Sequence, residues 1–115
     1  KVTVAIMPFG GPKGKPTTFG KKMADLIQAK LLGYQWILVE RNRIDSIIKE
    51  KTLITAGVIE EKNFIEIGTI MGADYAITGT TYYGKKALVV AKVIDISTGT
   101  VVGMAQVYID FRDYE

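Results

Sequence analysis

The chain has 115 residues, of which 48% are apolar and 23% charged, a length that suits one domain with a single hydrophobic core. It contains no cysteine and no histidine, which excludes disulfides and removes the commonest ligands of zinc and other transition metals. Fifteen lysine and arginine residues against twelve acidic ones give a net charge of +3, and a balance this mildly basic argues only weakly for nucleic-acid recognition.

The first third of the chain predicts a strand, a loop and a helix. Residues 2–9 form a nearly continuous apolar run rich in β-branched side chains, as in a strand covered on both faces. Glycine, proline and lysine dominate residues 10–18, which therefore form a loop. The apolar residues that follow recur at helical spacing. We expect Thr17 or Thr18 to cap this helix and Gly33 to close it in a left-handed conformation.

The middle of the chain predicts a second strand and a second helix. Residues 35–40 return to a strand pattern, in which Trp36 is most simply a core residue. Asn42 and, three residues later, Asp45 resemble a capping pair at the start of the helix. The apolar face of this helix consists of Ile44, Ile47 and Ile48. The less regular residues 52–58 are read as a connection.

A third helix then precedes three strands. Glu60 and Glu61 place negative charge where the helix dipole favours it, and Gly72 ends the helix. The β-rich runs that follow cover residues 75–83, 87–96 and 101–111. Their short connections impose antiparallel pairing, whereas strands joined through helices pair in parallel. We therefore predict an α/β (α+β) fold, a mixed sheet of about five strands with about three helices packed on it, as a single domain over residues 1–115.

The last strand has an alternating pattern. One face is apolar and consists of Val101, Gly103, Ala105, Val107, Ile109 and Phe111. The other face is more polar and consists of Gln106, Tyr108, Asp110 and Arg112. This alternation predicts a sheet that helices cover on one side.

The loop at residues 10–18 does not match a phosphate-binding loop. It lies between a strand and a helix, as such loops do, but Gly10 and Gly14 are one residue too close together. Pro16 also occupies the position of the hydroxyl group that would hold magnesium.

Catalysis and metal binding lack suitable residues. The two serines, Ser46 and Ser97, have no histidine to activate them. A pair of carboxylates would have to come from Glu40 and Asp74, but Glu40 beside Arg41 is more simply a structural ion pair. We therefore predict no catalytic residue, no metal site and no cofactor.

Two features near the last strands are read as structural. Asp95 is expected to bond the backbone of Ser97 or Thr98 in a turn. Three tyrosines accompany Lys85 and Lys86, a combination that nucleic-acid-binding sheets also use; they are Tyr82, Tyr83 and Tyr108. We favour cross-strand packing for them and expect no nucleic-acid partner.

Four lysines gather at the start of the first helix: Lys13, Lys15, Lys21 and Lys22. Positive charge there opposes the helix dipole unless solvent or an anion screens it. We read these lysines first as solvated side chains. The alternatives are a site for phosphate, nucleotide or nucleic acid, and a contact surface for a protein partner.

Four segments together resemble the CsgG-like (curli-secretion lipoprotein) family, which includes penicillin-binding-protein activators and a flagellar-associated branch. The segments are VAIMPF (4–9), ILVERNRIDSIIKE (37–50), IGTIMGADYAITGT (67–80) and AKVIDISTGTVV (91–102). Their order and spacing cover nearly the whole chain. The resemblance implies the fold of the amino-terminal module of the periplasmic TolB protein.

The same resemblance implies a function without catalysis. Members assemble with, or bind, protein partners in the bacterial envelope, so we expect envelope proteins or self-association. It also implies a periplasmic, outer-membrane-anchored lipoprotein whose membrane contact is a lipid anchor upstream of Lys1. The connections of this chain are too short for the long hairpins of the secretion channel. The family's partner-binding residues follow no shared motif, so none is carried over.

Overall fold

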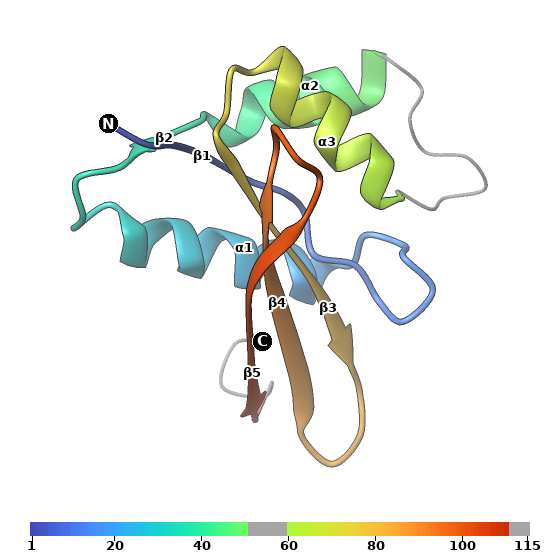
Figure 1. Ribbon diagram of the computed structural model, residues 1–115. Helices are drawn as coiled ribbons and strands as arrows, with labels where there is room; N and C mark the ends of the chain where they lie inside the picture. The colour runs from blue at the N-terminus through green and yellow to red at the C-terminus, as the bar shows by residue number, and fades with distance from the viewer. Residues whose placement is uncertain (51–59, 111–115) are drawn as a thin grey trace.

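The predicted order of strands and helices is confirmed by a computed structural model (Figure 1). The structure describes residues 1–50 and 60–110. Its elements are β1 (Thr3–Ile6), α1 (Thr18–Leu31), β2 (Ile37–Leu38), α2 (Arg41–Glu50), α3 (Glu61–Ile70), β3 (Tyr75–Tyr82), β4 (Ala87–Asp95) and β5 (Val101–Ile109). The connection predicted at residues 52–58, and Phe111 and Arg112 of the last predicted strand, lie outside the described residues.

The strands form one mixed sheet in the order β2-β1-β3-β4-β5. Strand β1 pairs in parallel with β2 and β3, as strands joined through helices are expected to do. Strands β3, β4 and β5 pair antiparallel through short connections. The predicted combination of parallel and antiparallel pairing is therefore confirmed.

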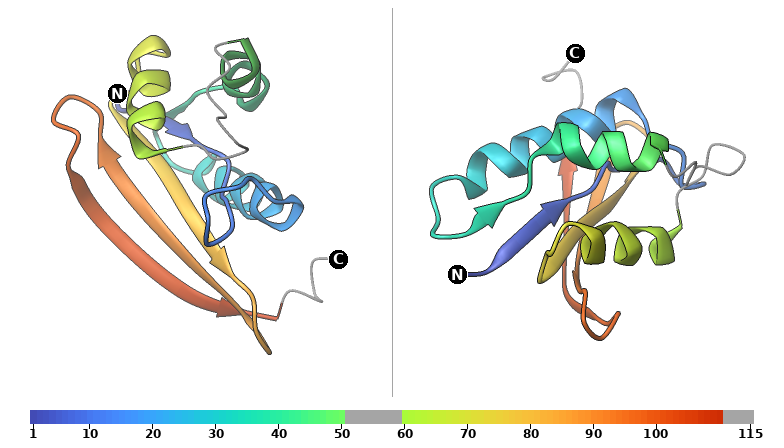
Figure 2. Two further views of the ribbon diagram at one scale, coloured as in Figure 1. Left: turned by 90° about the vertical axis from the view of Figure 1, so that its right-hand side faces the viewer. Right: turned by 90° about the horizontal axis from the view of Figure 1, so that it is seen from above.

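Helices cover both faces of the sheet around β1, which confirms the prediction that residues 2–9 form a strand covered on both faces. Val4 and Ile6 pack with Met23 of α1, whereas Ala5 and Met7 pack with the residues of α2 and α3 on the opposite face. Figure 2 shows β1 between α1 and the α2–α3 pair. A strand with both faces buried needs a continuous apolar run, which residues 2–9 provide.

Two of the predicted helix ends are confirmed. The Thr17 side chain accepts a hydrogen bond of 2.9 Å from the Gly20 amide, so Thr17 is the N-cap of α1. Gly72 follows α3 with a φ of +69°, the left-handed conformation that commonly ends a helix. Glu60 is the N-cap of α3 and forms a capping box with Asn63.

Two other predicted ends are wrong. Helix α1 ends at Leu31, its C-cap Leu32 has a right-handed conformation, and Gly33 has no positive φ. Helix α2 begins at Arg41, so Asn42 lies inside its first turn rather than before it. There the Asn42 carbonyl accepts a hydrogen bond of 2.9 Å from the Ser46 hydroxyl. The predicted apolar face of α2 is confirmed, because Ile44 and Ile48 are buried and Ile47 packs against the same cluster.

Trp36 is not a core residue, since 43% of its surface is exposed. The second predicted strand shrinks to the two residues of β2, which lies at one edge of the sheet. Trp36 therefore precedes the strand instead of lying within it. Its ring stacks on that of Tyr34, with the ring centres 5.9 Å apart.

Candidate functional site

The loop that carries two of the four lysines is fixed to the central strands by backbone hydrogen bonds. The Gly10 amide donates to the Gly79 carbonyl over 3.1 Å, and the Thr81 amide donates to the Gly10 carbonyl over 2.8 Å. The Gly11 amide closes the loop onto the Lys15 carbonyl over 2.8 Å, with Gly14 at a φ of +83° in the turn. The loop thus holds a defined conformation at the end of β1.

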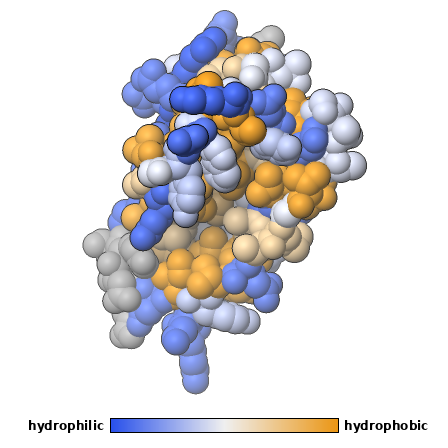
Figure 3. Space-filling view, turned by 60° about the vertical axis from the view of Figure 1, so that its left-hand side comes forward, coloured by the Kyte–Doolittle hydropathy of each residue, from blue (hydrophilic) through white to orange (hydrophobic). Residues whose placement is uncertain are grey.

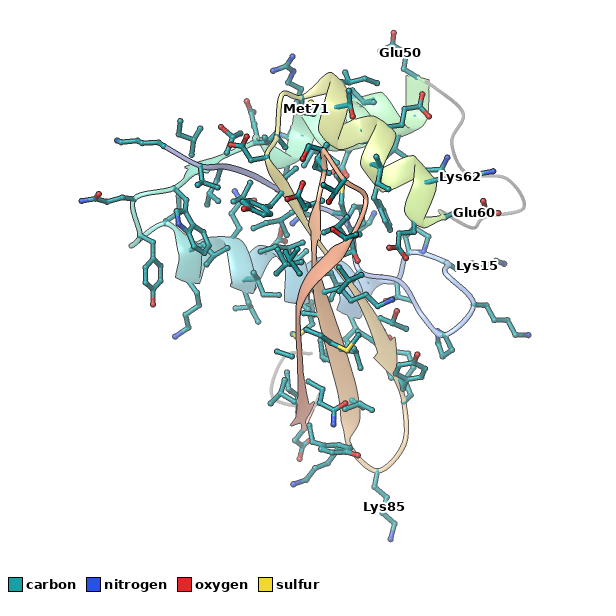
Figure 4. All side chains as sticks on the ribbon, viewed as in Figure 1. Lys15, Glu50, Glu60, Lys62, Met71 and Lys85 are labelled. Carbon is teal, nitrogen blue, oxygen red and sulfur yellow. The ribbon has the colours of Figure 1, made fainter. Side chains whose placement is uncertain are left out.

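Lys13, Lys15 and Lys21 are exposed, and their side chains form no hydrogen bond or ion pair with the residues that the structure describes. Lys22 is half-buried and does interact. Figure 4 shows Lys15 pointing into solvent on the side of the molecule where Glu60 and Lys62 lie. The first turn of α1 has no acidic residue to offset these lysines. Their role as a binding site stays a prediction.

A small cavity lies beside the lysine loop. It has a volume of about 140 Å³ and is lined by the loop, the start of α3 and the middle of β3 and β4. Its charged lining residues are Glu61 and Lys92, which carry opposite signs. Ligand pockets usually measure about 300 Å³ or more, so this cavity does not suit a cofactor or a substrate of that size.

The two candidate catalytic carboxylates do not share a site. Glu40 follows β2, whereas Asp74 precedes β3, so the two lie at opposite ends of parallel strands. Asp74 accepts a hydrogen bond of 2.9 Å from the Thr3 amide, a structural role. The predicted Glu40–Arg41 pair is wrong, because Arg41 lies 3.1 Å from Asp25 of α1 instead.

Asp95 performs the predicted turn role. Its Oδ1 accepts hydrogen bonds from the Ser97 hydroxyl at 2.7 Å, the Ser97 amide at 2.9 Å and the Thr98 amide at 3.3 Å. These bonds, that of the Ser97 hydroxyl above all, lower the pKa of Asp95, although partial desolvation opposes them. The Asp95 carboxylate therefore accepts the hydrogen bonds that hold the β4–β5 turn.

Neither a metal centre nor a membrane-spanning helix is found in the described part of the chain. Across residues 1–50 and 60–110, no three acidic side chains gather closely enough to hold a metal ion. Within the same ranges, every helix is too short or too polar to cross a bilayer.

Two of the three tyrosines near Lys85 and Lys86 lie in one cross-strand row. Tyr82 lies opposite Leu88, which in turn lies opposite Tyr108. Tyr83 contacts Phe19 of α1, with the ring centres 6.0 Å apart. The cross-strand arrangement is thus observed for Tyr82 and Tyr108, whereas Tyr83 follows β3 and packs on a helix instead. Each of the three side chains remains at least 43% exposed.

The exposed side chains of β5 are a surface that the sequence analysis missed. Met104 is 64% exposed and Val107 on the opposite face is 52% exposed, so the predicted cover of one face by helices does not extend to β5. Figure 3 shows hydrophobic side chains among charged ones over the lower and right-hand part of the face that it presents. The feature of the sequence that points to this surface is the absence of charged residues from positions 97–109.

Comparison with known proteins gives a family match and several similar folds. The model of the family described as curli production assembly/transport component CsgG matches residues 3–112. No curated protein sequence matches the chain. Among solved structures, the LpoB C-terminal domain from Salmonella enterica has a TM-score of 0.69 at 11% identity, over 95% of this chain and 82% of that one.

Two further solved structures have the same fold. Lipoprotein GNA1162 from Neisseria meningitidis has a TM-score of 0.74 at 14% identity, over 96% of this chain and 81% of that one. TolB from Acinetobacter baumannii has a TM-score of 0.56 at 13% identity, over 95% of this chain and 23% of that one. At such identities the likeness concerns the fold, and it agrees with the fold implied by the resemblance of the sequence.

Proposed function

Because the chain belongs to the family of the curli production assembly/transport component CsgG, we propose that it is a non-enzymatic accessory domain of the bacterial cell envelope. Family membership over residues 3–112 is the observation that carries this proposal. The domain acts by binding other proteins. Its location is the periplasm, where a lipid anchor upstream of Lys1 tethers it to the outer membrane.

The geometry gives no support to a catalytic role for the pair Glu40 and Asp74. The two carboxylates lie at opposite ends of the parallel strands, and neither lines the small cavity beside the lysine loop. The proposal therefore assigns the function to the surface of the domain. LpoB and GNA1162 share the fold, and GNA1162 is itself described as a lipoprotein.

Within this function, the lysine loop is the proposed contact with an acidic region of a partner. Lys13 and Lys15 are exposed on a loop that is hydrogen-bonded to β3, so their charges are presented at a fixed place on the surface. Lys21 and Lys22 add positive charge near the start of α1. Charge of one sign on a fixed surface steers an oppositely charged protein and orients it.

A charge-reversal experiment in cells tests this contact. A photoreactive residue at position 18, next to the loop, would cross-link a bound envelope protein, and the adduct would be identified by mass spectrometry. Thr18 is exposed and lies in the first turn of α1. We expect Lys13→Glu/Lys15→Glu to remove the adduct.

The matched control is Lys85→Glu/Lys86→Glu, which changes the net charge by the same amount at the tip of the β3–β4 hairpin. We expect the adduct to persist in this control. An adduct that survives both double substitutions would remove the lysine loop from the proposal. Absence of the chain from the periplasmic and membrane fractions would overturn the envelope function itself.

Phosphate and nucleic-acid binding is the alternative that the same lysines allow. Titration with a nucleotide and with a short oligonucleotide at two salt concentrations separates it from protein binding. Binding that weakens steeply with salt and disappears in Lys13→Glu/Lys15→Glu would favour the alternative.

A further inference from the structure

Strand β5 is an edge of the sheet that lacks the usual protection against pairing. The opposite edge, β2, has two residues, whereas β5 has nine. Residues 97–109 contain no charged residue and no proline, and side chains on both faces of β5 are exposed. Proteins commonly protect long edges with charge, proline, a β-bulge or a covering helix. The irregularity in the β4–β5 pairing lies at the start of β5, so within residues 1–50 and 60–110 the outer edge from Gly103 to Ile109 is open to pairing.

Every second residue of β5 directs its amide and carbonyl groups away from β4, where a further strand can bond them. The pairing with β4 is irregular only near Val93 and Ile94, which lie opposite the start of β5. From Gly103 to Ile109 the strand is regular, so its outer edge offers a continuous row of backbone donors and acceptors.

We propose that β5 pairs antiparallel with β5 of a second copy of this chain, across a twofold axis at Ala105. In this register Gly103 lies opposite Val107 of the second copy, and Met104 lies opposite Gln106. The two five-stranded sheets thereby become one sheet of ten strands. The occupant of the edge is thus a segment that the chain itself supplies.

The composition of β5 favours a second copy over a different protein. A twofold interface requires a strand that fits itself, and this register places small Gly103 against larger Val107. Each copy has a net charge of +3, yet the paired strands oppose no like charges because β5 has none. A different partner would obtain no ionic specificity from this edge.

The antiparallel orientation also separates the lysines of the β3–β4 hairpin. Lys85 and Lys86 precede Ala87, which pairs with Ile109 at the far end of β5. Figure 4 shows Lys85 projecting from this tip. With Ile109 opposite Val101 of the second copy, the two tips lie roughly 27 Å apart, beyond the Debye length at physiological salt. Parallel pairing would instead bring four lysines together.

Disulfide formation tests the register, because the chain has no cysteine of its own. Two Ala105→Cys chains would place their thiols opposite each other, and we expect a disulfide-linked dimer under mild oxidation. Val107→Cys is the matched control on the same face of the strand. In the proposed register the thiols of two Val107→Cys chains would be about 13 Å apart along the strands, too far for a disulfide.

Sedimentation of the unmodified chain at several concentrations tests the dimer itself. We expect a reversible dimer that Met104→Lys/Gln106→Lys weakens about tenfold, because two pairs of lysines then face each other. Met104→Lys/Gln106→Glu would instead place opposite charges across the axis and preserve the dimer. Both side chains are exposed in the single chain, and far-UV circular dichroism verifies that each variant folds.

A monomer at every concentration would overturn the pairing, and so would a dimer that is equally stable with Met104→Lys/Gln106→Lys. Efficient cross-linking of Val107→Cys rather than Ala105→Cys would contradict the register. The pairing does not rest on the proposed function. Loss of the dimer through β5 variants and loss of an envelope partner through Lys13→Glu/Lys15→Glu are separate outcomes.

Discussion

Phe9 is the residue against which the first helix and the central sheet pack most closely. Its side chain is fully buried. A Cβ atom on Gly20 of α1 would lie 2.0 Å from the Phe9 carbonyl oxygen, and a Cβ atom on Gly79 of β3 would lie 2.3 Å from its ring. Glycine at both positions therefore permits contacts that any larger residue would prevent.

Gly20→Ala is expected to lower the free energy of unfolding by about 2 kcal/mol. Alanine favours a helix over glycine by about 1 kcal/mol, but the clash with the Phe9 backbone outweighs that gain because a carbonyl group cannot move aside. Urea denaturation measures the difference. Gly33→Ala is the control, since the nearest atom to its Cβ would be 3.9 Å away. A Gly20→Ala variant as stable as the parent chain would contradict this packing.

Asp95 makes a pH-dependent contribution to stability. The hydrogen bond from the Ser97 hydroxyl has the largest effect on the pKa of Asp95 and lowers it below the ordinary value of an aspartate. Desolvation, the next largest effect, opposes it, and the Thr98 and Ser97 amides lower the pKa further. A carboxyl group with a lowered folded-state pKa stabilises the fold above its unfolded-state pKa, and this contribution is lost as the pH falls through the folded-state value.

We therefore expect Asp95→Asn to lose less stability than the parent chain when the pH is lowered from about 5 to about 2. Urea denaturation at several pH values measures this slope. Asp45→Asn serves as the control, because Asp45 is exposed on α2 and outside the β4–β5 turn. Equal slopes in Asp95→Asn and the parent chain would show that the turn does not favour the charged form.

At the scale of the helices, one predicted N-cap, Thr17, is correct and another, Asn42, is wrong. Thr17→Ala removes the hydrogen bond to the Gly20 amide and is expected to cost about 1 kcal/mol of stability. Asn42→Ala tests the cap that the sequence predicted and the structure does not contain. It should change stability by less than about 0.5 kcal/mol, because only the Asn42 backbone is bonded. Thermal unfolding of the two variants compares them, and equal losses would contradict the observed start of α2.

The elements that the sequence predicts well are those determined by local patterns. The spacing of Ile44, Ile47 and Ile48 places them on one face of α2, and the glycine-containing turn before β5 imposes an antiparallel pair. Trp36 was misplaced because its burial depends on the length of β2, which pairing with β1 limits to two residues. The residues around Trp36 do not by themselves indicate how long β2 is.

The candidate surfaces also differ in whether the local sequence predicts them. Lys13 and Lys15 are visible in the sequence because a short loop brings them together. The Arg41–Asp25 pair is not, since its members are 16 positions apart in the sequence and belong to different helices, α1 and α2. The exposure of β5 likewise depends on where α1 lies, so the alternation along the strand predicts a covered face that the structure does not contain. Both the Arg41–Asp25 pair and the exposure of β5 therefore depend on contacts between elements that are distant in the sequence.

For the molecule as a whole, strand β1 connects two buried clusters. Val4 and Ile6 belong to the cluster on the α1 face, and Ala5 and Met7 belong to the cluster on the face of α2 and α3. Neither cluster can lose β1 without disturbing the other. We therefore expect the described part of the chain to unfold in one cooperative transition.

Ile44→Ala tests this coupling from the face opposite the single tryptophan. Ile44 is fully buried among α2 and α3, and its truncation should cost about 2 to 5 kcal/mol. Trp36 lines a groove with Val4 and Ile77, so its fluorescence reports on the α1 face. Because β1 joins the two faces, the fluorescence and circular dichroism midpoints in urea should fall together.

The control for Ile44→Ala is Ile70→Ala, which removes an equally large side chain that is 42% exposed and should shift both midpoints much less. If Ile44→Ala lowered the circular dichroism midpoint and left the Trp36 fluorescence midpoint unchanged, the α1 face would be able to stay folded without α2 and α3. Strand β1 would then not couple the two faces, and the chain would have to contain two units of independent stability.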